Sequence, residues 1–143
     1  MTDYQKTVLV RASPDVLFSA LTTVSGLSSW WTDVSSSGDE LTFSFDSPLV
    51  MRVDQALPVR VQWTAIACAF LPDWVGTRPT FGITPISDGL TELRFCHYGL
   101  NSELDCIEIC SRGWDHVMES LRLFVEVGLG MPRGSAGDLA RRR

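Results

Sequence analysis

The sequence predicts an α+β domain in which one long C-terminal helix lies across an antiparallel β-sheet. The first observation is the spacing over residues 106–128, where apolar side chains return every three or four positions and form one broad helix face. The second is that most of the preceding chain alternates apolar and polar residues, as half-buried strands do. A long helix covering such a sheet is a two-layer design.

The composition is that of a single globular domain. The chain has 143 residues, of which 45% are hydrophobic and 20% charged, and a chain of this length buries roughly 70% of its unfolded surface. The net charge of −5 argues against a nucleic-acid partner, which usually requires a basic face. No apolar run approaches the roughly 20 residues of a membrane span, and the first residues lack a secretory pattern, so we expect a cytoplasmic protein.

The N-terminal third predicts one strand followed by two short helices. Residues 4–10 form the strand, with the β-branched pair Thr7 and Val8. Ser13 is a candidate N-cap, and Pro14 suits the first position of a helix over residues 14–21. A second short helix is expected over residues 24–31.

The middle of the chain predicts a run of strands joined by tight turns, which makes neighbouring strands antiparallel. Residues 35–38 are expected to be a turn and residues 70–76 a loop. Arg60, Arg78 and Arg94 share the polar face, which we expect to be solvated. The expected strands are residues 41–45, 50–57, 59–65, 77–86 and 93–97.

The chain beyond the long helix is expected to be a tail. Gly128, Gly130 and Pro132 end the helix. We therefore divide the chain into a domain at residues 1–130 and a flexible basic tail at residues 131–143.

The four cysteines are expected to be reduced and structural. Cys106 and Cys110 lie one helical turn apart, where a disulfide is geometrically difficult. Together with His97 they match none of the usual zinc spacings. Cys68 and Cys96 complete the set, and cysteine often behaves as a small buried hydrophobe. We expect no metal site and no cofactor.

The inward face of the sheet and the apolar face of the long helix define a candidate ligand pocket. Apolar pockets with a few polar groups are the usual form of small-molecule sites, although aromatic side chains on such faces also serve simply as core. The candidate lining residues are Trp30, Phe43, Phe45, Met51, Trp63, Trp74, Phe81, Phe95, His97, Trp114, Met118 and Leu121.

His97 is the best candidate for a catalytic group. It shares strand parity with Leu93 and Phe95 and is expected to face inward. Its pKa near neutrality would allow general acid–base catalysis, but it could equally remain neutral and donate to a backbone carbonyl. His116 lies off the apolar stripe and is expected to be solvated. No nucleophile elbow, phosphate loop or dinucleotide fingerprint is present.

The order of elements and several local stretches resemble the START-like (SRPBCC) helix-grip superfamily, and within it the branch similar to the activator of Hsp90 ATPase (AHSA1-like). The likeness extends over roughly residues 5–130. The stretches that carry it are Val10 with Ala12, Ser13, Pro14 and Val16; Leu27 with Trp30 and Trp31; Trp63; the strand TELRFCHYG at residues 91–99; and Trp114 through Leu121 with Gly128.

The resemblance implies a curved antiparallel sheet wrapped around the long helix, with a cavity between them. Members bind lipids, aromatic polyketides or hormones, and a few are cyclases or aromatases. The first function we consider is therefore binding of a small hydrophobic molecule, lipid-like or aromatic. The alternatives are a polyketide cyclase- or aromatase-like enzyme using His97, and an interaction module for an Hsp90-type chaperone.

Overall fold

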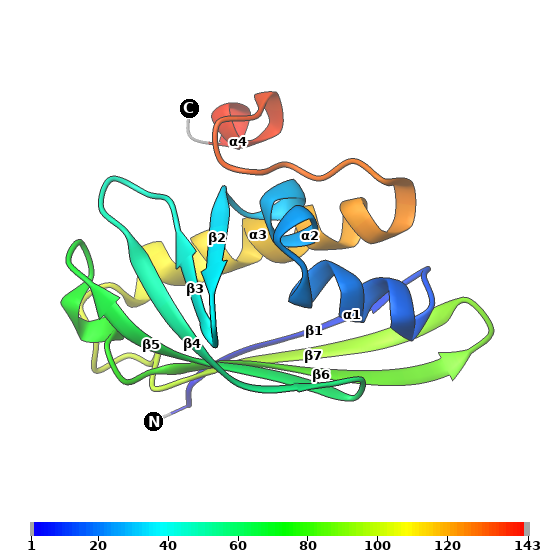
Figure 1. Ribbon diagram of the computed structural model, residues 1–143, viewed down its shortest axis with the longest axis horizontal. Helices are drawn as coiled ribbons and strands as arrows, with labels where there is room; N and C mark the ends of the chain where they lie inside the picture. Colours follow the sequence, from blue (N-terminus) through cyan, green and yellow to red (C-terminus); the bar gives the residue numbers. More distant parts are fainter. Residues whose placement is uncertain (1, 142–143) are drawn as a thin grey trace.

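The computed structural model describes residues 2–141 and confirms the α+β architecture with a curved sheet and a long C-terminal helix. The sheet is antiparallel and seven-stranded, in the order β1-β7-β6-β5-β4-β3-β2. Figure 1 shows the helices gathered on one side of it. The strands are β1 (Tyr4–Val10), β2 (Val34–Ser37), β3 (Glu40–Phe43), β4 (Leu49–Leu57), β5 (Arg60–Cys68), β6 (Arg78–Ser87) and β7 (Leu90–Tyr98).

The two expected short helices and the long helix are all present. None of the helices among residues 2–141 is long and apolar enough to cross a membrane. The helical elements are α1 (Pro14–Thr22), α2 (Val24–Trp30), the 3-10 turn η1 (Pro72–Trp74), α3 (Ile107–Val127) and α4 (Ala136–Arg141).

Local capping explains where the helices begin and end. The Ser13 hydroxyl accepts a hydrogen bond from the Val16 N–H at 3.3 Å, and Pro14 occupies the first helical turn of α1. The Thr23 hydroxyl caps α2 in the same way, accepting from the Gly26 N–H at 3.0 Å. Helix α3 ends at Gly128, whose φ of 81° is left-handed and favours glycine.

Strand parity separates a buried face from a wet one. Along β7 the side chains of Leu93, Phe95 and His97 are buried. Arg60, Arg78 and Arg94 are exposed on the opposite face, as predicted. Two register shifts in β4, at Val50/Met51 and Val53/Gln55, bend the strand, and such bulges help the sheet to curve around α3.

The expected turn at residues 35–38 was wrong, because most of this stretch is a strand. Val34–Ser37 forms β2, which pairs with β3 and places Val34 opposite Phe43. The turn comes only at Gly38, whose φ is 60°. Three consecutive serines carry no apolar alternation, so their β structure comes from the hydrogen-bonded ladder with β3 rather than from a pattern readable in sequence.

The stretch expected to be a flexible tail is, as far as residue 141, packed against the domain; residues 142–143 lie outside the described part. After α3 the chain reverses and runs back past α2 to α4 (Figure 1). The Met131 N–H donates to the Ser120 hydroxyl at 2.6 Å, and the Arg133 N–H donates to the Trp31 carbonyl at 2.7 Å. A glycine- and arginine-rich composition suggests a tail, but these long-range bonds leave no sequence pattern.

Candidate ligand pocket beside the long helix

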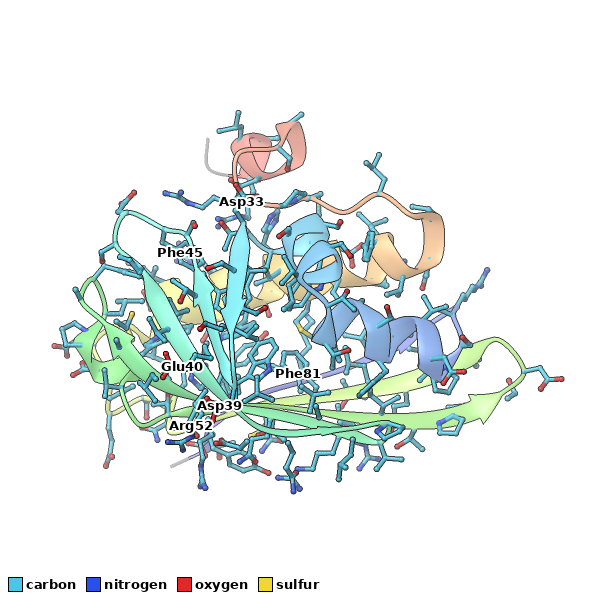
Figure 2. The ribbon with its side chains drawn as sticks, in the orientation of Figure 1. Asp33, Asp39, Glu40, Phe45, Arg52 and Phe81 are labelled. Carbon is cyan, nitrogen blue, oxygen red and sulfur yellow. The ribbon has the colours of Figure 1, made fainter. Side chains whose placement is uncertain are left out.

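Most of the candidate lining residues form a filled core rather than the wall of a cavity. Trp30, Phe43, Met51, Trp63, Phe81, Phe95, His97, Met118 and Leu121 are at most 2% exposed and do not line the pocket described below. Figure 2 shows Phe81 deep between the sheet and the helices, whereas Phe45 lies toward the end of the molecule that carries α4. Of the candidates, Phe45, Trp74 and Trp114 do line a pocket.

The core is a continuous network of aromatic rings that passes through Trp31 and Trp114. The ring centroid of Trp114 lies 4.3 Å from that of Phe95, 5.1 Å from that of Trp31 and 6.1 Å from that of Trp74, with which it stacks. Trp31 in turn stacks on Trp63 at 6.2 Å. Offset and tilted pairs at these separations are favourable beyond the area that they bury. Trp31, Trp74 and Trp114 belong both to this network and to the lining of the pocket described below.

His97 is buried inside this network with both ring nitrogens engaged. The Trp114 indole N–H donates to Nδ1 at 2.9 Å, so Nδ1 carries no proton and Nε2 does. Nε2 then donates to the Thr77 hydroxyl at 2.7 Å, and that hydroxyl donates to the Trp74 carbonyl at 2.6 Å. Burial lowers the pKa of His97 to about 3, and the charge of Asp3 opposes the shift only weakly. This geometry favours the neutral, structural role that the sequence left open.

The glycine that follows His97 fits the same arrangement. Gly99 has a φ of 96°, which a side chain would strain, and a Cβ there would lie 2.9 Å from the methyl group of Thr77. Thr77 is the residue that accepts from His97. The His-x-Gly ending of β7 therefore keeps the chain close to the partner of the buried imidazole.

A pocket of about 220 Å³ lies between the first half of α3 and the C-terminal segment, which we define as residues 131–141. One wall is the helix itself, from Ile109 to Val117. Further lining comes from Trp31, from Phe45 and Leu49 after β3, and from the loop before β6. The lining residues are Trp31, Phe45, Leu49, Phe70, Leu71, Trp74, Ile109, Cys110, Gly113, Trp114, His116, Val117, Met131, Arg133, Asp138 and Arg141.

Sequence reasoning missed much of this lining. Val117 lies three residues after Trp114 on the same helix face, so the period of α3 could have indicated it, whereas Gly113 lies outside the apolar stripe. The adjacent tryptophans lie in different places. Trp30 is the last residue of α2, and its indole N–H donates to the Ala20 carbonyl at 2.8 Å, whereas Trp31 is the C-cap and lines the pocket. The backbone of Trp31 has left the helix, so the direction of its side chain does not follow from the helix period.

The polar groups of the pocket stand mainly on the wall built by the C-terminal segment. Asp138 is 3% exposed, accepts from the Gly134 N–H at 2.9 Å and lies 3.6 Å from His116 and 3.5 Å from Arg141. The expectation that His116 is solvated was wrong, because its side chain is only 10% exposed. Its ring nitrogen also lies 3.2 Å from the Met131 carbonyl, so it helps to hold the C-terminal segment in place.

The thiols near the pocket have the properties of inert, buried groups. Burial raises the pKa of Cys110 to about 12, and the Trp74 indole N–H donates to its sulfur at 3.3 Å. Burial also raises the pKa of Cys68. A thiol with a raised pKa is protonated at neutral pH and is a poor nucleophile. Within the described residues, no group of three His, Cys, Asp or Glu side chains is arranged to hold a metal ion.

Solved structures resemble this chain along most of its length. The Aha1 dimer from Colwellia psychrerythraea is 29% identical, with a TM-score of 0.79, and the match covers 91% of this chain and 100% of that one. MLL2253 from Mesorhizobium loti is 22% identical with a TM-score of 0.69, covering 83% and 94%. CalU16 from Micromonospora echinospora is 14% identical with a TM-score of 0.69, covering 96% and 81%. No protein-family model and no curated protein matches the chain. These likenesses show a helix-grip fold.

Proposed function

We propose that this protein binds a small hydrophobic molecule, lipid-like or aromatic, in the pocket beside α3. The observation that carries the proposal is the pocket wall itself, in which the indole rings of Trp31, Trp74 and Trp114 come together with Phe45 and Phe70. Aromatic and aliphatic walls with a few polar groups are the usual form of a small-molecule site. A flat ring or a short chain would gain apolar contact area against these rings.

The size of the pocket limits the ligand. About 220 Å³ is below the range of roughly 300–1,000 Å³ that holds drug-sized ligands. The pocket suits a single or fused ring, or one end of a longer chain whose remainder stays outside. The filled aromatic core beneath argues against a large ligand enclosed between helix and sheet.

Gly113 offers a direct test because it lines the pocket and a Cβ there meets no atom within 4 Å. Gly113→Leu should occupy the pocket and weaken a saturable ligand-induced change in tryptophan emission by at least about tenfold in Kd. Gly113→Ala is the matched control and should bind nearly as wild type does. Its free energy of unfolding should be about 0.5–1 kcal/mol higher, because alanine is the better helix former. Equal affinities for the leucine and alanine variants would contradict binding at this site.

An enzyme of the cyclase or aromatase type, with His97 as its acid or base, is less well supported. His97 does not line the pocket, and its ring nitrogens are both engaged with Trp114 and Thr77. A general acid or base must reach the reacting atom within hydrogen-bond distance. The likeness to CalU16, at 14% identity, concerns the fold alone.

The Aha1 structure motivates a second candidate function, that of an interaction partner for an Hsp90-type chaperone. The match covers 91% of this chain and the whole of that one, and it supports placing the chain in the AHSA1-like branch. A chaperone ATPase assay with and without the protein separates this candidate from ligand binding. Stimulation would favour the interaction module, and an unchanged rate would remove it.

A further inference from the structure

The charges around the pocket are unequal in how firmly they are paired. Arg141 lies 3.5 Å from Asp138, whose carboxylate is almost fully buried and also accepts from the Gly134 N–H. That carboxylate therefore needs its cationic neighbour Arg141, because an uncompensated buried charge is costly. Arg141 is tied to this buried carboxylate, although its own side chain is 38% exposed.

Arg133 is paired with a carboxylate that is far more exposed. Its guanidinium donates to Asp46 at 2.9 Å, but the Asp46 side chain is 93% exposed. An ion pair between groups so open to water typically contributes only about 0–1 kcal/mol and is screened by salt. Asp46 could turn into solvent at little cost and leave the guanidinium to another anion.

Arg133 is nevertheless held beside the aromatic wall. Its backbone N–H donates to the Trp31 carbonyl at 2.7 Å, and its guanidinium carbon lies 5.6 Å from the centre of the Phe45 ring. Both Trp31 and Phe45 line the pocket. The anchored backbone places a cation at the edge of an apolar site, with its side chain one-third exposed.

We infer that the natural ligand is an amphipathic carboxylate whose apolar part enters between Trp31, Trp74 and Trp114 and whose carboxylate is received by Arg133. The planar guanidinium fork matches a carboxylate in a bidentate geometry. A carboxylate at the pocket edge would lie in less water than that of Asp46, so it would pair with Arg133 more strongly. This inference rests on the proposed function, since it names the chemistry of the ligand in the same pocket.

The test compares probes that share an apolar part and differ only in charge: 2-naphthoate with 2-naphthylmethanol, and octanoate with octanol. Each is titrated to its solubility limit at pH 7 and followed by tryptophan emission. Wild-type protein should bind the carboxylate of at least one pair roughly tenfold or more tightly than its alcohol. Arg133→Gln should remove that preference and weaken binding of the carboxylate much more than binding of the alcohol.

Three further variants separate charge from structure. Arg133→Lys should keep part of the preference, because it retains the charge but loses the fork. Asp46→Asn should strengthen carboxylate binding by removing the competing anion. Arg94→Gln, on the opposite face of the sheet and paired with Glu92, should behave as wild type. Thermal unfolding of each variant shows that it remains folded.

The outcomes distinguish this inference from the proposed function. Equal affinities for acid and alcohol, or a preference that survives in Arg133→Gln, would overturn the carboxylate inference and leave hydrophobic binding intact. Failure of every probe to give a saturable change in wild-type protein would contradict the proposed function and, with it, this inference.

Discussion

Replacing Trp114 with alanine is expected to lower the free energy of unfolding by roughly 3–5 kcal/mol. Its indole is 2% exposed and packs on Phe95, Trp31 and Trp74. The truncation would open a large cavity and leave His97 Nδ1 without its donor. Most domains have only about 5–15 kcal/mol of stability in total, so a large share would be lost. Urea unfolding followed by circular dichroism measures the change.

A milder substitution isolates the hydrogen bond from the packing. Trp114→Phe keeps a ring but removes the N–H that His97 Nδ1 accepts, and an unpaired buried polar group costs about 1–3 kcal/mol. In a double-mutant cycle with His97→Leu, the second substitution should cost less once the first has been made. Strictly additive effects would show that the two side chains are not coupled and would contradict the hydrogen bond.

Stability is expected to fall on acidification because His97 is buried in its neutral form. Its pKa is lowered to about 3 in the folded protein, whereas the pKa of histidine in an unfolded chain is about 6.5. Between these values the unfolded chain binds a proton that the native chain does not. The stability that comes from keeping His97 neutral is therefore fully present above about pH 6.5. As the pH falls from there toward 3, the free energy of unfolding drops by about 1.4 kcal/mol per pH unit.

The matched variant for this effect is His97→Gln. Both proteins keep His116 and the carboxylates, so the difference between their stability profiles reports His97 alone. Wild type should lose about 2 kcal/mol more than the variant between pH 7 and pH 5. Parallel profiles from urea unfolding across this range would show that His97 is not held neutral in the native state.

The fold could be predicted from sequence because its signals are local. The helix expected at residues 106–128 is observed as Ile107–Val127, and the capping roles of Ser13 and Pro14 are those expected. Strand parity also assigned His97 to the buried face. Each of these depends on a period or a cap within one element.

The pocket could be predicted only in part, because it depends on packing between elements. Alternation shows that Phe43 and Trp63 face inward but does not show that neighbouring rings fill the space between them. The packing of the C-terminal segment could not be predicted, because its hydrogen bonds to Ser120 and Trp31 join residues that share no sequence pattern. Arg133 was missed for the same reason.

The central claim, that a small hydrophobic molecule binds beside α3, is tested most directly by following the indole N–H resonances of the five tryptophans during a ligand titration. We expect saturable shifts of Trp74 and Trp114, which line the pocket, and much smaller shifts of Trp30 and Trp63, which do not. Larger shifts of Trp30 and Trp63 than of Trp74 and Trp114, or no saturable shift of any indole with lipid-like or aromatic probes, would contradict it.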